Sequence, residues 1–152
     1  ALLVAGGIGV PPVLCLAREL AARGIPYTVS IGAASKGCLV GEDEFEAAGA
    51  PVISVATDDG SYGYHGFCTA AAEQVLELED GEFDYVAACG PEPMMAKVAA
   101  AAAKAGVPCE VSLERMTSCG FGACSTCAVE TTSGMKGACM CGPVFNAEEV
   151  VW

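Results

Sequence analysis

Four cysteines near the end of the chain constrain its fold more than any other feature of the sequence. Cys119, Cys124 and Cys127 follow a C-x4-C-x2-C spacing, and Cys139 comes twelve residues after Cys127. With this spacing a single loop can wrap a [2Fe–2S] cluster, whose irons need four thiolates converging on one small inorganic core. We therefore predict these four cysteines as the metal ligands.

Glycines inside and after the loop support this prediction. Gly120 and Gly122 allow positive φ angles and let backbone N–H groups approach the sulfides, where larger side chains would clash. The turn-like pair Ser133-Gly134, with Gly137, predicts a hairpin that returns Cys139 to the other three cysteines. The end of the chain thus reads as a small cysteine-rich [2Fe–2S] module.

Two non-redox interpretations remain open. Cys124, Cys127, Cys139 and Cys141 form two close pairs that could close a tetrahedral, structural zinc site. That site would leave Cys119 and the flanking glycines without a role. In the other interpretation the chain is a binding domain whose cysteines are simply buried, a fate we expect for the six cysteines outside the predicted ligand set.

Composition and charge restrict the partners. The 152-residue chain carries a formal net charge of −12 with only seven Lys and Arg, so we expect neither nucleic acid nor an anionic membrane surface as a partner. Glycines and prolines interrupt the most apolar stretch, residues 1–17, so no transmembrane helix is expected. Ten cysteines without an export signal indicate thiols and metal ligation in a reducing cytoplasm. The chain lacks an initiator Met and begins within a strand pattern, which predicts a fragment.

Apolar runs alternate with helical patterns before the cysteine segment. Strands are predicted at residues 1–5, 27–31, 51–56, 83–88 and 107–113, and helices at 13–23, 42–48, 69–78 and 95–105, with Thr69 as an N-cap. This alternation predicts an α/β fold with a five-stranded, parallel, doubly wound Rossmann-like sheet.

The turn after the first predicted strand has the composition of a dinucleotide-binding loop. Gly6, Gly7 and Gly9 precede a predicted helix, where small residues admit a pyrophosphate and the helix N-terminus offers free N–H groups. Pro12 replaces the third glycine of the usual fingerprint, so a tight turn without a ligand is the alternative. No acidic residue ends the second strand to hold a ribose, and Lys36 is the one base near it.

Two further turns follow later strands. The predicted nucleotide-site residues there are Thr57, Asp58, Asp59 and Gly60 after the third strand, and Cys89, Gly90, Pro91 and Met94 after the fourth. Because the carboxyl ends of parallel strands meet at one edge of a sheet, we expect the loops after strands one, three and four to converge on one crevice. We expect an NAD(P)-binding domain over residues 1–113 and a [2Fe–2S]-binding module over residues 114–152.

These motifs together resemble a known family. Residues 6–12 and 89–94 resemble the pyrophosphate and nicotinamide motifs of ferredoxin–NADP reductase-like domains. Residues 57–63, 112–116 and 139–145 narrow the resemblance to the electron-transfer subunit of class 1B dihydroorotate dehydrogenase, over the whole chain.

The resemblance implies a role in pyrimidine biosynthesis. The intact subunit would relay electrons between NAD, FAD and a [2Fe–2S] cluster, to or from an FMN-containing catalytic subunit that oxidises dihydroorotate. Val10 and Pro11 would join the three glycines at the pyrophosphate. No part of the chain matches the family's N-terminal FAD barrel, so we expect the chain alone to be inactive with NADH. The sequence shows no catalytic acid–base set, which suits an electron relay.

Two details bear on this assignment. The runner-up is the small subunit of a ferredoxin:NADP oxidoreductase or sulfide dehydrogenase, which typically has Asp at the position of Cys119. The family usually has Asp where this chain has Cys141, so the identity of the fourth ligand stays open between Cys139 and Cys141.

Overall fold

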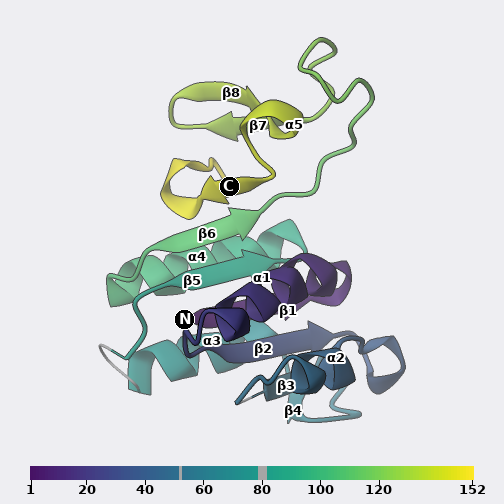
Figure 1. Cartoon of the computed structure of the whole chain (residues 1–152), viewed down its shortest axis with the longest axis vertical. Coiled ribbons are helices and arrows are strands. Elements are labelled where there is room, and N and C mark those ends of the chain that lie inside the picture. Colours follow the sequence, from purple (N-terminus) through teal and green to yellow (C-terminus); the bar gives the residue numbers. More distant parts are fainter. Residues whose placement is uncertain (52, 79–81) are drawn as a thin grey trace.

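A seven-stranded sheet forms the centre of the computed structural model, which describes residues 1–51, 53–78 and 82–152. Its strands are β1 (Leu2–Gly6), β2 (Thr28–Ala33), β3 (Ile53–Thr57), β4 (Tyr64–His65), β5 (Val86–Cys89), β6 (Cys109–Ser112) and β9 (Val144–Asn146). Their spatial order is β4-β3-β2-β1-β5-β6-β9 (Figure 1). All neighbours are parallel except β6 and β9, which are antiparallel.

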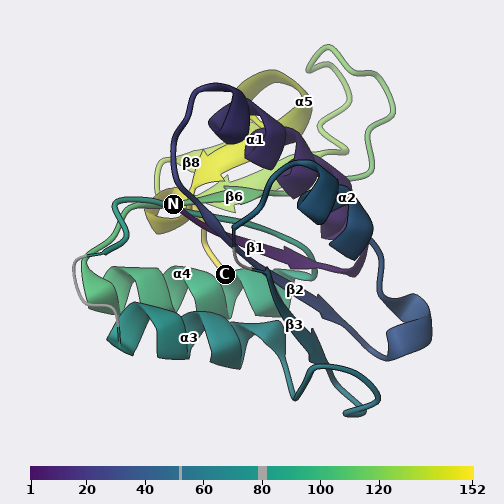
Figure 2. The same ribbon diagram turned by 60° about the horizontal axis from the view of Figure 1, so that its bottom comes forward.

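Helices cover both faces of this sheet. They are α1 (Val10–Ala22), α2 (Glu42–Ala47), α3 (Cys68–Leu78) and α4 (Glu92–Ala105). In Figure 2, α3 and α4 lie together on one face, and α1 and α2 lie on the other. Short 3₁₀ turns at Gly7–Gly9 and Lys36–Cys38 follow β1 and β2. Within the described residues no helix is long and apolar enough to cross a membrane.

Strand β1 shows why the sheet has two helical layers. Its residues Leu2, Leu3, Val4 and Ala5 are fully buried. Because successive strand side chains point to opposite faces, Leu2 and Val4 join the cluster under α3 and α4, whereas Leu3 and Ala5 join the cluster under α1. A continuous apolar run is what a strand buried on both faces requires.

The five predicted strands are confirmed as five of the six parallel strands, with shifted ends, and β4 is the sixth. Val52, in the third predicted strand, lies outside the described residues. Helices α1 and α4 begin three residues earlier than predicted, because Pro11 and Pro93 are accommodated in their first turns. The prediction of Thr69 as an N-cap is wrong. Helix α3 already begins at Cys68, which packs tightly on Gly32 of the sheet.

The cysteine segment forms a small hairpin and also contributes the last strand of the large sheet. Strands β7 (Ala128–Thr131) and β8 (Gly134–Gly137) make an antiparallel hairpin, followed by α5 (Ala138–Cys141), β9 and a 3₁₀ turn at Ala147–Glu149. In Figure 1 the hairpin and α5 lie beyond β6, at the edge of the sheet. Strands β4 and β9 were not predicted, since runs of two and three residues carry no readable periodicity.

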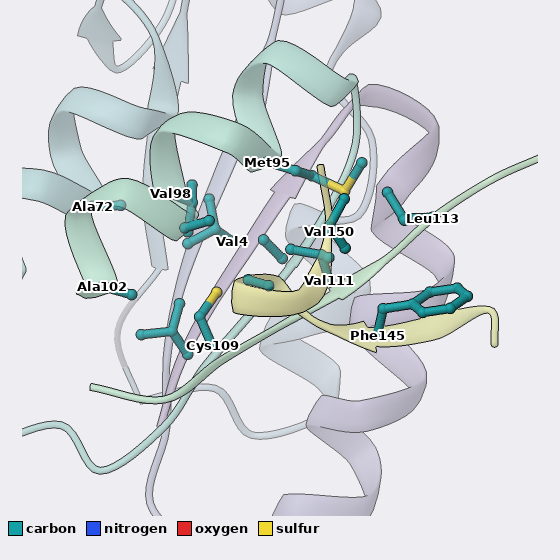
Figure 3. Packing of buried hydrophobic residues seen from close by; sticks show 14 of the residues in the cluster. Val4, Ala72, Met95, Val98, Ala102, Cys109, Val111, Leu113, Phe145 and Val150 are labelled. Atoms are coloured by element: carbon teal, nitrogen blue, oxygen red, sulfur yellow. The ribbon is translucent and has the colours of Figure 1, made fainter. Parts of the chain in front are cut away.

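One apolar core joins the hairpin to the sheet. Phe145 of β9 stands opposite Val111 of β6, and both are buried. Their cluster also contains Cys127, Val129 and Val150, and packs against α4 (Figure 3). The Leu113 N–H donates to the Pro143 carbonyl at 2.9 Å. The metal module is therefore fixed to the nucleotide half of the molecule by packing as well as by the chain.

Gly9 offers a direct test of the βα packing. A Cβ at this position would overlap the backbone carbonyl of Cys89, which cannot move without disturbing β5. We expect Gly9→Ala to destabilise the fold by about 3 kcal/mol and to lower the melting temperature by roughly 6–12 °C. Thermal unfolding followed by circular dichroism measures the effect.

The matched control is Gly37→Ala, because a Cβ there meets only the Ser35 hydroxyl at 3.9 Å. A Gly9→Ala variant that melts with the Gly37→Ala variant would contradict the packing.

Candidate metal centre and nucleotide crevice

The chain crosses over between β1 and β5, which are neighbours in space but not in sequence. At such a point the loops leave the two strands in opposite directions, and open α/β sheets bind ligands in the crevice that results. Strand β1 ends at Gly6 and β5 ends at Cys89. Two crevices flank this point.

The larger one, called here the long crevice, has a volume of about 380 Å³. It runs from the turn after β1, past the end of β2, to Asp58 after β3, and the first turns of α3 and α4 form its other wall. The smaller one, called the short crevice, has a volume of about 280 Å³ and is lined by Gly90, Glu92 and Arg115 among others. The expected convergence of the loops after β1, β3 and β5 is confirmed.

The predicted nucleotide residues divide into two groups. Those that line a crevice are Gly6, Gly7, Asp58, Gly90, Pro91 and Met94. Those that line neither crevice are Gly9, Val10, Pro11, Thr57, Asp59, Gly60 and Cys89. Their assignment as ligand contacts stays a prediction.

Several residues of the second group shape the loops instead. The Thr57 hydroxyl accepts from the Tyr62 N–H at 3.0 Å and donates to the Tyr62 carbonyl at 2.6 Å. Asp59 accepts from the Ser61 hydroxyl at 2.6 Å, and this hydrogen bond lowers the pKa of the Asp59 carboxyl. Val10 is buried in close contact with Gly41. The hydrogen bonds of Thr57 and Asp59 shape the turn after β3, whereas Val10 packs against the residue that precedes α2.

The turn after β1 fits a pyrophosphate. Helix α1 has no side chain capping its N-terminus and no acidic residue in its first turn, so its positive dipole end is available to an anion, although Pro11 and Pro12 carry no N–H. Gly7 has a φ of +52°, and a Cβ there would meet no other atom within 4 Å. The backbone at Gly7 is thus open to close approach by phosphate oxygens, whereas the Met94 side chain lies against Gly6.

Sequence reasoning missed several residues of the long crevice. The end of β2 contributes Gly32, Ala33 and Ala34, and the helices contribute Phe67 and Lys97. The small residues after β2 were a readable signal, because an open crevice needs them. An aromatic residue before α3 and a lysine one turn into α4 carry no such signal.

The cysteine loop has the geometry that its glycines predict. Gly120 and Gly122 adopt φ angles of +75° and +83°. The β7–β8 hairpin pairs Ala128 with Gly137 and brings the two ends of the segment together. As a result, the Cys139 N–H lies 3.5 Å from the Cys127 sulfur. The predicted return of Cys139 to the site is confirmed.

Backbone N–H groups in the loop favour thiolates. The N–H groups of Phe121 and Cys124 lower the pKa of the Cys119 thiol to about 6. The Thr126 hydroxyl, 3.1 Å from the Cys124 sulfur, lowers the pKa of that thiol. The Cys139 N–H does the same for Cys127, while contact with the Cys127 side chain raises the pKa of Cys139. Iron binds thiolates, so this loop is prepared for ligation.

The four sulfurs form two pairs. The side chains of Cys119 and Cys124 interact directly, and so do those of Cys127 and Cys139, with weaker charge coupling between the pairs. Among the described residues no three Cys, His, Asp or Glu side chains are grouped as ligands of a single ion. Paired thiolates suit a two-iron core, in which each iron takes two of them.

Cys141 lies outside this arrangement. A cavity of about 270 Å³ is lined by Cys119, Cys127 and Cys139, whereas Cys124 and Cys141 are exposed outside its lining. Residues two apart on a helix point about 200° apart, so Cys139 and Cys141 cannot face the same cavity. The geometry favours Cys139 as the fourth ligand.

Fold and site together define a class of protein, a ferredoxin reductase-type nucleotide domain that carries an iron–sulfur module. Comparisons with known proteins support this class. Residues 114–151 match the family model described as the iron–sulfur cluster binding domain of dihydroorotate dehydrogenase B. The structure of an NADH-dependent reduced ferredoxin–NADP oxidoreductase superposes with a TM-score of 0.87 at 36% identity, covering 100% of this chain and 54% of that one.

Curated relatives make the assignment more specific. The probable electron transfer subunit of dihydroorotate dehydrogenase B (NAD(+)) from Methanocaldococcus jannaschii is 41% identical over 151 residues, covering 98% of this chain and 56% of the relative. The corresponding subunit from Geobacillus thermodenitrificans is 44% identical over 154 residues, covering 99% and 57%. Over the length that it spans, the chain is homologous to these electron transfer subunits, and its residues 114–151 belong to their iron–sulfur domain family. It spans little more than half of their length.

Substitution of single cysteines tests the ligand set. After anaerobic reconstitution with iron and sulfide, we expect Cys119→Ser, Cys124→Ser, Cys127→Ser and Cys139→Ser each to lose most of the visible absorbance per chain, because each leaves an iron one thiolate short. Absorbance and iron content per chain are the measurements.

Cys141→Ser is the matched control, and it should retain the wild-type spectrum. A variant series in which Cys141→Ser loses the cluster and Cys139→Ser keeps it would contradict the geometry described above.

Proposed function

We propose that this chain supplies the NAD(H) site and the [2Fe–2S] site of an electron transfer subunit that serves an FMN-containing dihydroorotate dehydrogenase. FAD would complete the relay, bound mainly outside these 152 residues. The curated relatives are longer than this chain and have room for such a region.

The observation that carries the proposal is the attachment of the four-cysteine module to the nucleotide sheet. Strand β9 of the module pairs with β6, and β6 pairs with β5. These backbone hydrogen bonds fix the position of the module relative to β5, the strand that ends at the short crevice. The Cys89 thiol donates to the Ser112 carbonyl at 3.3 Å, just before the segment that leads to the cysteines. An electron relay needs its centres held close and in a fixed order.

An ion pair also holds the cysteine segment against the nucleotide half of the molecule. Arg115, in the segment leading to the cysteine loop, lies 2.8 Å from Glu92 in the first turn of α4. The guanidinium is largely shielded and also donates to the Glu114 carbonyl at 3.0 Å. The approach to the metal site is thereby tied to the turn that borders both crevices.

Each part of the chain has a defined task in this scheme. Nicotinamide exchanges a hydride, flavin passes electrons singly or in pairs, and a [2Fe–2S] cluster carries one at a time. Gly7 leaves the backbone open to the pyrophosphate of NAD. Cys119, Cys124, Cys127 and Cys139 would hold the irons, with N–H groups of the loop directed at sulfur, a contact that raises the reduction potential of such centres.

The relatives are named electron transfer subunits, which implies a catalytic partner. Apolar side chains around the cysteine loop are exposed, namely Met116, Phe121 and Met140. A contact with the partner would cover them, and we propose that the partner is the FMN-bearing subunit.

Reconstitution tests the metal half of the proposal. Anaerobically reconstituted protein should contain about two irons and two acid-labile sulfides per chain and should bleach with dithionite. Zinc is assayed on the same sample. Colourless protein with one zinc per chain would contradict the proposal and support a structural staple.

A second experiment tests the electron route. With the FMN-containing dihydroorotate dehydrogenase of the same organism present, dihydroorotate should bleach the cluster absorbance of the reconstituted chain. The Cys124→Ser variant should show no bleaching. Intact cluster absorbance in the presence of partner and substrate would contradict the proposed partner. With NADH and an acceptor dye but no FAD, we expect no turnover by the chain alone.

A further inference from the structure

Cys124 is the most exposed of the four predicted iron ligands. Cys127 is buried, and Cys119 and Cys139 are half-buried. Cys124 is open to solvent and lies outside the lining of the cavity that the other three share. A thiolate in this position is solvated by water unless the protein supplies a donor of its own. Any donor that the chain places beside this sulfur therefore affects how readily the centre holds additional negative charge.

A threonine hydroxyl supplies such a donor. The Thr126 Oγ1 atom lies 3.1 Å from the Cys124 Sγ atom and donates to it. The Thr126 N–H is directed at the same sulfur, and both contacts favour the thiolate. Among the described residues, the other donors to the four ligand sulfurs are backbone N–H groups or cysteine side chains. Within this part of the chain, Thr126 thus provides the one hydrogen bond to these sulfurs that a side-chain substitution removes without changing a ligand.

The backbone at Ser125 accounts for this geometry. Ser125 has a φ of +56° and is the one described residue other than glycine with a positive φ. This left-handed region is disfavoured for a residue with a side chain, so such a conformation persists only where its surroundings determine it. The turn at Ser125 lets the hydroxyl and the N–H of Thr126 both reach back to the Cys124 sulfur. The loop thus keeps an unfavourable conformation at the position that directs this donor.

A cation beside the cavity is not a substitute for this donor. Lys136 lines the cavity, and a positive charge there would also stabilise a reduced centre. However, its amino group lies 2.6 Å from the Glu149 carboxylate, and both side chains are half-buried. The carboxylate therefore offsets the charge of Lys136 at the cavity. The Thr126 hydroxyl, in contrast, contacts the Cys124 sulfur directly.

A hydrogen bond to a ligand sulfur strengthens when the centre gains an electron. Reduction adds one negative charge that the irons share with their thiolates, and a donor at sulfur stabilises this charged state more than the oxidised one. We propose that Thr126 is a positioning residue that acts through Cys124 and raises the reduction potential of the cluster by donating its hydroxyl to the Cys124 sulfur. This proposal rests on the proposed [2Fe–2S] site and adds the residue that sets how readily the site accepts an electron.

The test is a potentiometric titration of the anaerobically reconstituted chain, with dithionite as the reductant and redox dyes as mediators, followed by electron paramagnetic resonance. Thr126→Val keeps the shape of the side chain and removes its hydroxyl. We expect this variant to lower the equilibrium constant for one-electron reduction by about three- to tenfold. That change corresponds to a fall of about 30–60 mV, at about 59 mV per tenfold. Thr126→Ala should lower the potential in the same direction.

Two further variants keep the test specific. Thr126→Ser retains the hydroxyl, so its equilibrium constant should stay within about twofold of wild type. Thr117→Val removes another exposed threonine hydroxyl of the same segment, which donates to the Arg115 carbonyl at 3.1 Å and not to sulfur. It should leave the potential unchanged. Each variant should contain about two irons and two sulfides per chain, which separates a change in potential from a loss of the cluster.

Several results would overturn the proposal. An unchanged or raised potential in Thr126→Val, an equal fall in Thr126→Ser, or an equal fall in Thr117→Val would each do so. Loss of iron from both Thr126→Val and Thr126→Ala would do so as well, because the hydroxyl would then serve assembly of the cluster and not its potential.

A failure of the proposed function is seen separately. The titration needs no NAD, FAD or partner subunit, whereas the relay is read from the bleaching of the wild-type cluster by dihydroorotate and the partner. A wild-type chain that takes up zinc and no iron would contradict the proposed function before any variant is compared.

Discussion

The pairing of β9 with β6 is the interaction on which the rest of the molecule depends. It adds the last strand of the cysteine segment to a sheet built by the preceding residues, and it buries Phe145 against Val111 in one shared core. Because β6 also pairs with β5, the position of β9 is fixed relative to β5, the strand that ends between the two crevices. Two sites with different chemistry are thus held at a fixed separation by backbone hydrogen bonds.

Backbone groups do most of the electrostatic work in both sites. The chain is strongly acidic, yet each site has to hold a further negative group, a pyrophosphate or a set of thiolates. At the nucleotide turn the positive dipole end of α1 serves this purpose, since Pro11 and Pro12 provide no N–H. In the cysteine loop N–H groups directed at sulfur lower the pKa of Cys119 and Cys127. Glycine allows both, by keeping Gly7 uncovered and by letting Gly120 and Gly122 adopt positive φ.

Much of the fold and of the metal site could be predicted from the sequence, because the patterns that indicate them lie within short segments. The buried run at Leu2–Gly6, the cysteine spacing and the turn before Cys139 each fix a structure within a few residues. Strand β9 and the crevice-lining residues Phe67 and Lys97 could not be predicted, since their positions come from contacts with distant segments. The Thr69 cap failed for the same reason: contact of Cys68 with Gly32 determines where α3 begins. Sequence motifs also gave nucleotide roles to Gly9 and Val10, which the fold buries in packing contacts.

Electron paramagnetic resonance of the dithionite-reduced, reconstituted chain tests the central claim most directly. A [2Fe–2S] core ligated by Cys119, Cys124, Cys127 and Cys139 takes up one electron and should give one unpaired spin for every two irons. The Cys127→Ser variant should lose that signal, and Cys141→Ser should keep it. A reduced sample that contains two irons per chain but shows no such spin, or an unchanged signal in Cys127→Ser, would contradict the account.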